Sequence, residues 1–135
     1  MNPEKASEHL FENLKWDENG LIPCVVQEAE DGDVLMVAYM NRESLEKTLS
    51  EKKACYWSRS RKKLWLKGEE SGNFQEVQKV SVDCDGDCIL LQVEQIGGAA
   101  CHTGMQSCFY RSVAGKDKLV AEGERIFDPS KVYKK

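Results

Sequence analysis

Short apolar stretches separated by polar turns recur along this chain, and they predict a fold built mainly from β-strands. Residues 24–29 and 33–40 have strand character, and the Asp31-Gly32 pair between them is typical of a hairpin turn. Further strands are predicted at residues 54–58, 64–66, 75–84, 88–96 and 108–113.

Two segments instead have helical patterns. Residues 4–15 place several apolar side chains on one face at the spacing of an α-helix. Asn41 is a suitable N-cap for a helix over residues 42–51, whose first turn carries an acidic side chain. The charged tail from Asp117 is expected at the surface. Together these elements predict an α+β fold, mainly antiparallel β-sheet with a few short helices, in a single domain.

Composition narrows the possible settings and partners. The chain has 135 residues, enough for one domain, and a formal net charge of −4, which argues against a general binder of polyanions. It begins without the apolar segment of a signal peptide, and no apolar run approaches the roughly 20 residues of a transmembrane helix. Six cysteines could form disulfides in a secreted protein, but this composition favours thiols or metal ligands in the cytoplasm.

Three acidic residues, spaced two apart, surround a cysteine: Asp83, Asp85 and Asp87 around Cys84. If this segment is extended, the carboxylates project on one face and Cys84 on the other, because side chains alternate along a strand. Adjacent carboxylates repel unless a cation neutralises them, and their oxygens suit a hard ion such as magnesium. A solvated acidic turn is the simpler alternative, whereas an EF-hand loop is set aside because Gly86 comes too early for it.

Three cysteines have a spacing that fits a metal site. Cys101 and Cys108 flank a glycine-containing loop, and Cys84 is a candidate third ligand. Thiolates suit zinc, and three protein ligands leave a fourth position for water, as in catalytic zinc sites. A fourth thiolate from Cys88 would make the site structural, although its neighbours indicate a buried strand residue. The other two cysteines lie in apolar strands and are expected in the core: Cys24 and Cys55.

His102 directly follows one of these candidate ligands. It could be a metal ligand, a loop residue at the surface, or an acid/base group beside a metal-bound water. We favour the acid/base role, because the chain has only two histidines and this one adjoins a candidate ligand.

A basic segment, Ser58-Arg59-Ser60-Arg61-Lys62-Lys63, lies ahead of Trp65 and Lys67. Arginine can bind phosphate through two hydrogen bonds, and serine hydroxyls add further donors. A solvated charged hairpin is the simpler interpretation, and a mixture of basic and aromatic residues is also typical of single-stranded nucleic acid binding. The acidity of the whole chain and the candidate metal ligands favour a small phosphorylated ligand.

Taken in order, these motifs resemble those of phosphoribosyl-AMP cyclohydrolases, enzymes of histidine biosynthesis, from about Trp16 to Arg111. The similar segments are Leu35-Met36-Val37-Ala38-Tyr39-Met40-Asn41, Tyr56-Trp57-Ser58-Arg59-Ser60-Arg61, Leu64-Trp65, Lys67-Gly68, Ser71-Gly72, Gln75, Asp83-Cys84-Asp85-Gly86-Asp87, Cys101-His102-Thr103-Gly104 and Ser107-Cys108-Phe109. The resemblance implies one cyclohydrolase domain over residues 1–135, with its core at about 16–111 and no fused pyrophosphohydrolase domain.

The resemblance also implies an activity. A member of this family hydrolyses the adenine ring of phosphoribosyl-AMP between N1 and C6, giving the opened formimino-carboxamide ribonucleotide. A zinc-activated water is expected to attack C6, with His102 as the catalytic acid/base. The substrate-binding residues expected from the matching motifs are Arg59, Ser60, Arg61, Trp65, Lys67, Ser71 and Gln75.

Metals and assembly follow from the same resemblance. It implies an intertwined homodimer in which Cys84 of one subunit and Cys101 and Cys108 of the other hold one zinc per subunit. It assigns magnesium to the three aspartates: Asp83, Asp85 and Asp87. Neither nucleic acid nor a membrane is an expected partner.

Two other classes of protein are alternatives. A structural zinc module that binds nucleic acid through the basic segment predicts a closed zinc site and salt-dependent binding of oligonucleotides. The basic residues that it would use are Arg59, Arg61, Lys62 and Lys63. A zinc nucleoside deaminase needs a His/Cys-x-Glu motif with a Pro-Cys-x-x-Cys partner, and the sequence contains neither.

Overall fold

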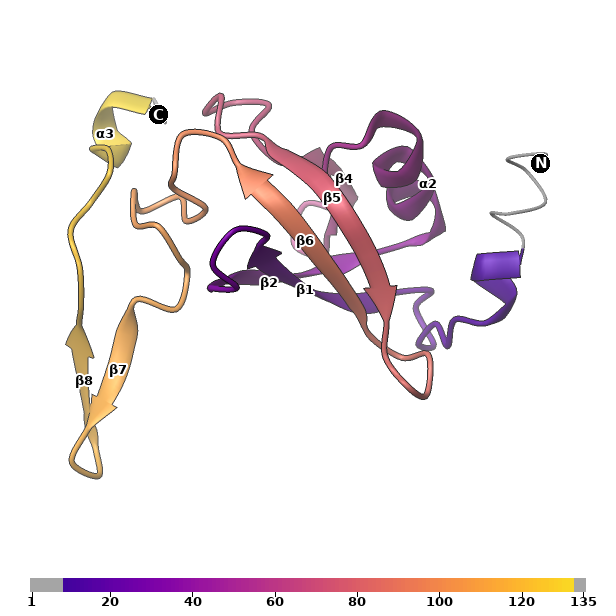
Figure 1. The fold of residues 1–135 in the computed structure, drawn as a ribbon, viewed down its shortest axis with the longest axis horizontal. Helices are drawn as coiled ribbons and strands as arrows, with labels where there is room; N and C mark the ends of the chain where they lie inside the picture. Colours follow the sequence, from indigo (N-terminus) through magenta and orange to yellow (C-terminus); the bar gives the residue numbers. More distant parts are fainter. Residues whose placement is uncertain (1–8, 133–135) are drawn as a thin grey trace.

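The computed structural model describes residues 9–132, which form a curled β-sheet with short helices (Figure 1). The elements in chain order are β1 (Ile22–Glu28), β2 (Val34–Met40), α2 (Arg42–Glu51), β3 (Cys55–Ser58), β4 (Lys63–Leu66), β5 (Gln75–Val82), β6 (Ile89–Gln95), β7 (Arg111–Ala114), β8 (Lys118–Ala121) and α3 (Pro129–Val132). Of the helix predicted over residues 4–15, residues 9–12 are helical, and residues 4–8 lie outside the described part. No helix within residues 9–132 has the length and apolar character needed to cross a membrane.

Six strands form one mixed sheet in the order β4-β3-β2-β1-β6-β5. Neighbouring strands are antiparallel except for β1 and β6, which run parallel with Cys24 opposite Ile89. The predicted single-domain α+β fold is therefore confirmed, as is its mainly antiparallel sheet. The parallel pair was not anticipated, because its two strands lie far apart in the sequence and leave no local signal.

Helix α2 begins where the sequence predicts. The Asn41 side chain accepts a hydrogen bond from the Ser44 backbone N–H at 2.8 Å, and the Ser44 hydroxyl accepts one from the Asn41 N–H at 2.9 Å. Such a capping box satisfies backbone donors at the helix start and is worth about 1 kcal/mol. Leu45 packs the helix into the core, and buried Thr48 connects it to β3 through the Cys55 backbone.

A buried polar network joins three strands of the sheet. The Tyr56 hydroxyl on β3 donates to Gln75 Oε1 on β5, and Gln75 Nε2 donates to Gln95 Oε1 on β6 at 2.8 Å. Gln75 Nε2 also contacts the Met36 sulfur at 3.4 Å. Burial raises the pKa of Tyr56 well above its usual range, so the hydroxyl keeps its proton and its role as donor. The network fixes these strands relative to one another.

The hairpin of β7 and β8 stands apart from the sheet (Figure 1). A strand was predicted at residues 108–113, but strand structure begins only at Arg111, and β8 was expected only as charged surface. Val113 and Leu119 lie opposite each other in the hairpin and are 67% and 60% exposed. An isolated two-stranded hairpin is at best marginally stable in water, so this exposed apolar pair suggests a contact surface.

Candidate functional site

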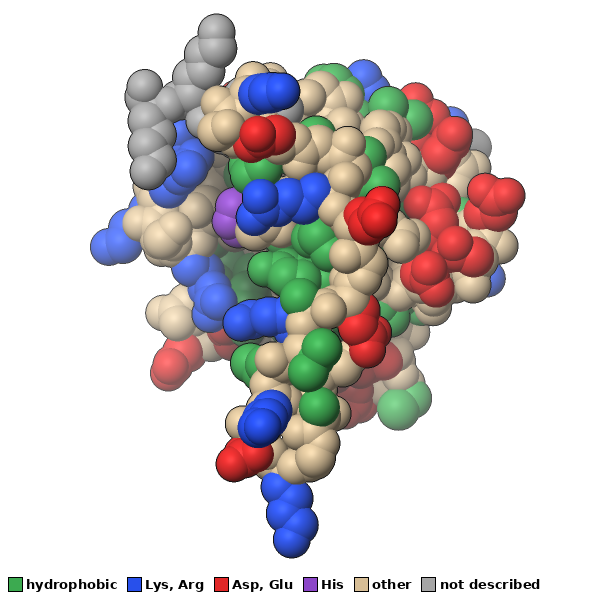
Figure 2. All heavy atoms as spheres, turned by 90° about the vertical axis from the view of Figure 1, so that its left-hand side faces the viewer, with side chains coloured by type: hydrophobic (Ala, Val, Ile, Leu, Met, Phe, Trp, Pro, Cys, Tyr) green, Lys and Arg blue, Asp and Glu red, His purple; other side chains and the backbone are tan. Residues whose placement is uncertain are grey.

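A cleft of about 720 Å³ opens between the β3–β4 hairpin, the loop after β4 and the loop over residues 100–108. Most of the site residues predicted around the substrate line it: Ser60, Arg61, Trp65, Lys67, Ser71, His102 and Cys108. On the face shown in Figure 2, basic side chains surround a hollow that contains hydrophobic side chains, and a histidine lies at its rim. A concave site of this size with a few converging polar groups is typical of small-molecule binding.

The 100–108 loop brings two of the three predicted zinc ligands together. The Ala100 N–H donates to the Gln106 carbonyl at 2.9 Å, which closes the loop on itself. The Cys108 N–H donates to the Leu35 carbonyl at 2.7 Å, which fixes Cys108 to β2. Cys101 is buried, and its thiol lies close enough to that of Cys108 to interact with it.

The environment of Cys108 favours its neutral, protonated form. Exclusion of water by neighbouring atoms, and then the adjacent Cys101 thiol, raises the pKa of Cys108 to about 12, although part of its side chain is exposed. A thiol with this pKa keeps its proton at neutral pH unless a metal ion replaces it. The Thr103 hydroxyl contacts Cys101 Sγ at 3.0 Å and helps to orient it. Two adjacent sulfur donors suit a soft ion such as zinc.

The C-terminal segment packs over this loop. The Ile126 N–H donates to the Gly104 carbonyl at 2.6 Å. Gly104 has φ +92°, and a Cβ at this position would clash with the Phe127 carbonyl oxygen, so the close approach requires glycine. Pro129 and Ser130 of α3 line the cleft, although the sequence analysis expected the tail only at the surface. No motif in the tail pointed to this contribution.

Lys67 lies on the inner side of the cleft and is only 5% exposed. Its Nζ donates to the Ala100 carbonyl and lies 5.4 Å from the centroid of the Trp65 ring. Among residues 9–132, no carboxylate forms an ion pair with it. Burial lowers the pKa of Lys67, and the nearby thiols of the 100–108 loop act in the opposite direction. The sequence motifs predicted Lys67 as a substrate-binding residue, but they gave no sign that it is buried beside the thiol pair.

Two predicted substrate-binding residues do not line the cleft. The Arg59 guanidinium lies over the Tyr39 ring on β2, 3.9 Å from its centroid. Gln75 is fully buried, and its amide is engaged by Tyr56 and Gln95. The structure thus gives Gln75 a role within the sheet, and its contact with a substrate stays a prediction that the geometry does not support.

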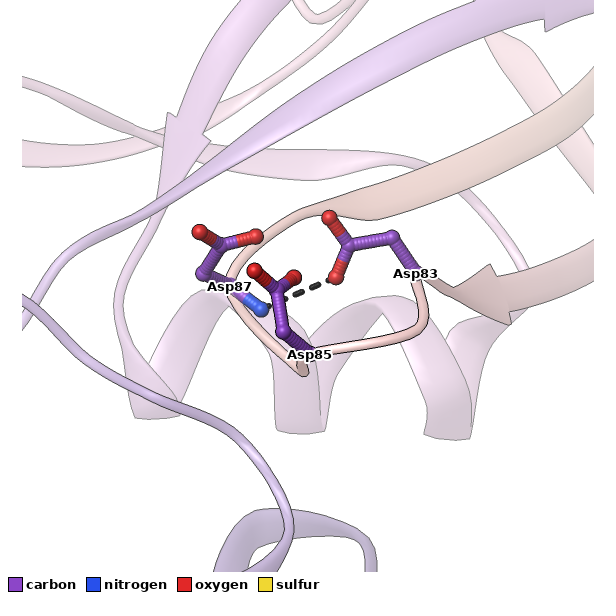
Figure 3. Close-up of side chains that lie close together, drawn as sticks. All are labelled: Asp83, Asp85 and Asp87. Carbon is purple, nitrogen blue, oxygen red and sulfur yellow. Dashed lines mark hydrogen bonds between the residues drawn. The ribbon is translucent and has the colours of Figure 1, made fainter.

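The three aspartates gather in the turn between β5 and β6 and not on a strand (Figure 3). The condition that residues 83–87 are extended is therefore not met, and side-chain alternation does not place these carboxylates. Gly86, at φ +77°, allows the chain to reverse, and the Asp83 side chain accepts the Asp87 N–H at 3.0 Å. One carboxylate oxygen from each of Asp83, Asp85 and Asp87 lies within 4.8 Å of the others. The turn brings the carboxylates together, and not the alternation of side chains along a strand.

The proximity of the carboxylates changes their proton affinity. A hydrogen bond with Asp83 raises the pKa of Asp87 to about 6, and the same pairing lowers the pKa of Asp83. A proton shared between the carboxylates reduces the repulsion among them, as a bound divalent cation would. Within the described part of the chain, this is the only cluster of three acidic, histidine or cysteine side chains with the spacing of a metal site.

Cys84 lies exposed in the same turn, at the far end of β6 from the thiol pair. The only group of three His, Cys, Asp or Glu side chains with metal-site spacing in residues 9–132 is the aspartate cluster, and no such group combines Cys84 with Cys101 and Cys108. Within one chain, the three predicted zinc ligands therefore do not meet. Cys24 and Cys55 are buried as predicted, whereas Cys88, expected to be buried, is only half-buried just before β6.

A second hollow, of about 610 Å³, lies between α2 and β5. Its lining includes Lys52, Lys53 and Glu76, and it contains none of the predicted site residues. The candidate chemistry thus concentrates in the first cleft, and we place the functional site there.

Comparison with known proteins gives a consistent family. The sequence model of the family described as phosphoribosyl-AMP cyclohydrolase matches residues 36–110 of this chain. A protein of that name from Desulfatibacillum aliphaticivorans is 62% identical over 116 residues, which cover 86% of this chain and 92% of the relative. Another, from Chlorobium limicola, is 60% identical over 128 residues, covering 93% and 91%. A third, from Chlorobium phaeovibrioides, is 55% identical over 132 residues, covering 98% and 96%.

Proposed function

The chain belongs to the phosphoribosyl-AMP cyclohydrolase family, and on that basis we propose that it hydrolyses the adenine ring of phosphoribosyl-AMP between N1 and C6. The product is the opened formimino-carboxamide ribonucleotide of histidine biosynthesis. The observation that carries this proposal is the cleft itself, which gathers phosphate-binding side chains, a histidine and a thiol at one place. Hydrolysis at C6 needs these parts: a bound nucleotide, a nucleophilic water and a proton acceptor.

The cleft offers suitable donors for the substrate. Arg61 lies in its lining with an exposed side chain, and a guanidinium can bind a phosphate through two parallel hydrogen bonds. Ser60 and Ser71 add hydroxyl donors from either side of β4. Trp65 packs against Tyr56 with ring centroids 5.5 Å apart, so it forms a fixed aromatic wall for the base or ribose.

A zinc ion is proposed at the thiols of the 100–108 loop, with Cys84 as the third ligand. The fit rests on two adjacent sulfur donors, Cys101 and Cys108, and on a thiol proton that a metal can replace. Bound zinc supplies a coordinated water whose pKa is close to neutral. All six cysteines are free thiols in the structure, which fits a reducing setting such as the cytoplasm.

His102 is the proposed acid/base residue. It is exposed at the cleft, and it follows Cys101 directly in the chain. An imidazole has one nitrogen that can accept a proton and one that can donate, so it can take a proton from the attacking water. The same group can then return a proton to the ring nitrogen that leaves C6.

A magnesium ion is proposed at the acidic turn. Asp83, Asp85 and Asp87 provide three oxygen donors within 4.8 Å of one another, and oxygen donors suit a hard cation. The raised pKa of Asp87 shows that the carboxylates crowd one another when only protons balance their charge.

The proposed enzyme is a homodimer with a shared zinc site. Among residues 9–132 of one chain, Cys84 forms no metal-type cluster with Cys101 and Cys108. A second subunit can supply the missing thiolate. The exposed apolar pair Val113 and Leu119, on the hairpin that follows Cys108, supports a contact with another protein surface close to the site.

The proposed reaction can be tested by the change in ultraviolet absorbance when the adenine ring opens. The wild-type protein should turn over phosphoribosyl-AMP, lose activity with a zinc chelator and recover when zinc is returned. His102→Asn should keep its zinc but lose about a hundredfold or more in turnover. Lys53→Met, in the second hollow, is the matched control and should retain activity.

Two results would contradict this function. One is a folded, zinc-loaded protein that shows no turnover of phosphoribosyl-AMP. The other is salt-dependent binding of oligonucleotides without turnover, which would favour a nucleic-acid-binding zinc module.

A further inference from the structure

Lys67 is placed where substrate binding alone does not account for it. It is 5% exposed, and no carboxylate of residues 9–132 forms an ion pair with it. A buried ammonium without a counter-ion is strongly unfavourable, so a negative partner is expected nearby. Its Nζ donates to the carbonyl of Ala100, the residue immediately before Cys101. Cys108 lines the same cleft.

We propose that Lys67 is the positive counter-charge of the zinc–thiolate cluster and that it sets how tightly the site holds its metal. The inference rests on the zinc site proposed above. It makes Lys67 a positioning residue of the metal site, whereas the sequence analysis assigned it to the substrate.

The charge balance explains why the lysine favours the loaded site. Zinc binds cysteine as the thiolate, any thiol proton that is displaced goes to solvent, and three thiolates outweigh the two positive charges of the ion. The loaded site therefore carries one net negative charge, which attracts a nearby ammonium. Metal binding thus gives the buried Lys67 the counter-charge that no carboxylate of residues 9–132 supplies, so Lys67 stabilises the loaded site.

The geometry holds the ammonium in position for this role. The Ala100 carbonyl accepts one of its three N–H donors, and the face of the Trp65 ring lies 5.4 Å from Nζ. Cys101 and Cys108 both lie close enough to interact with the charge of Lys67. Thiolate sulfurs can accept hydrogen bonds, so the other N–H groups have acceptors once the metal is bound. The bond to Ala100 also fixes the start of the ligand loop.

The test measures zinc affinity by competition with a chromogenic chelator, using the purified full-length protein. Lys67→Met keeps the length of the side chain but removes its charge, and it should weaken zinc binding about 10- to 100-fold. Lys67→Arg retains the charge and should restore part of the affinity. The matched control is Lys53→Met, which removes a partly buried lysine 4.7 Å from the Phe74 ring and should leave the affinity unchanged.

Cobalt(II) provides a second readout that does not depend on activity. The sulfur-to-cobalt charge-transfer band of Lys67→Met should keep its shape and appear only at higher metal concentration, because the ligands are intact. Circular dichroism confirms folding beforehand, and Lys67→Gln replaces Lys67→Met if that variant fails to fold.

Each outcome decides between distinct explanations. Wild-type zinc affinity in Lys67→Met together with a raised KM would overturn the proposal and return Lys67 to substrate binding. A wild-type protein that binds no zinc would refute the zinc site itself, and the proposal with it. Turnover of phosphoribosyl-AMP by the wild-type protein reports separately on the proposed reaction.

Discussion

Activity should return when two inactive variants of this protein are mixed, because the proposed zinc site takes Cys84 from one subunit and Cys101 and Cys108 from the other. Among residues 9–132 of one chain, these three thiols form no cluster with the spacing of a metal site, whereas zinc–sulfur bonds are only about 2.3 Å long. Cys84→Ser removes the ligand from the acidic turn, and Cys101→Ser removes one from the loop. Either dimer lacks a ligand in both of its sites, so each variant alone should lose most of its zinc and its turnover.

The expected recovery follows from the symmetry of the dimer. In a mixed dimer, both substitutions fall in one site, and the second site combines an intact Cys84 with an intact loop. Random exchange between equal amounts of the two variants gives about half mixed dimers, each with one working site of two. Zinc content and turnover should therefore recover to about a quarter of the wild-type values.

The assay uses two differently tagged variants, so that subunit exchange can be verified before zinc analysis and the absorbance assay. The matched control mixes Cys101→Ser with Cys108→Ser, because these substitutions damage both sites of every dimer and should restore nothing. Verified exchange without recovered zinc or turnover refutes the shared site. A fully active monomer in sizing chromatography would refute it as well.

Three further substitutions and one change of pH probe the substrate, the second metal and the fold. Arg61→Ala should raise KM about tenfold or more in steady-state kinetics, because a bidentate phosphate contact worth about 1–3 kcal/mol is lost; an unchanged KM indicates a solvated hairpin. Since a hydrogen bond with Asp83 raises the pKa of Asp87 to about 6, magnesium affinity measured by calorimetry should fall as pH drops below about 6, where a proton competes with the ion. Asp87→Asn should lose magnesium binding but keep its zinc. Tyr56→Phe should lower the free energy of unfolding in urea by about 1–3 kcal/mol, because Gln75 Oε1 loses its buried donor; an unchanged value contradicts the network.

Local signals in the sequence predicted the local structure well. The Asp31-Gly32 turn joins β1 to β2 as expected, and Asn41 caps α2, since both depend only on neighbouring residues. The parallel pairing of β1 with β6 depends on packing between distant segments, and no short-range pattern encodes it. The tail likewise gave no sign that α3 would reach the cleft.

The candidate site shows a different limit of sequence reasoning. The motifs correctly grouped Arg61, Lys67 and His102, because they belong to loops that meet at one cleft. Gln75 has the same polar side chain whether it binds a ligand or completes a buried network, so only the fold separates the two roles. Around Gly86 the residue types correctly indicated a cluster of carboxylates. The spacing of the aspartates, two residues apart, also suits a strand, whereas glycine at this position permits a turn.

The two sets of proposed metal ligands lie on either side of β6 in the sequence, with the carboxylates in the turn before it and the thiol pair in the loop after it. A partner subunit that supplies Cys84 to the thiol pair must bring its acidic turn as well, because Asp83 and Asp85 flank Cys84 directly. The partner's carboxylates then lie within about 10 Å of the zinc, close to the cleft. Unneutralised, they would repel a phosphorylated substrate, so a hard cation in the turn becomes a condition for binding. In the proposed dimer, the same turn therefore provides a thiolate for the reacting centre of the partner subunit and a cation for its substrate.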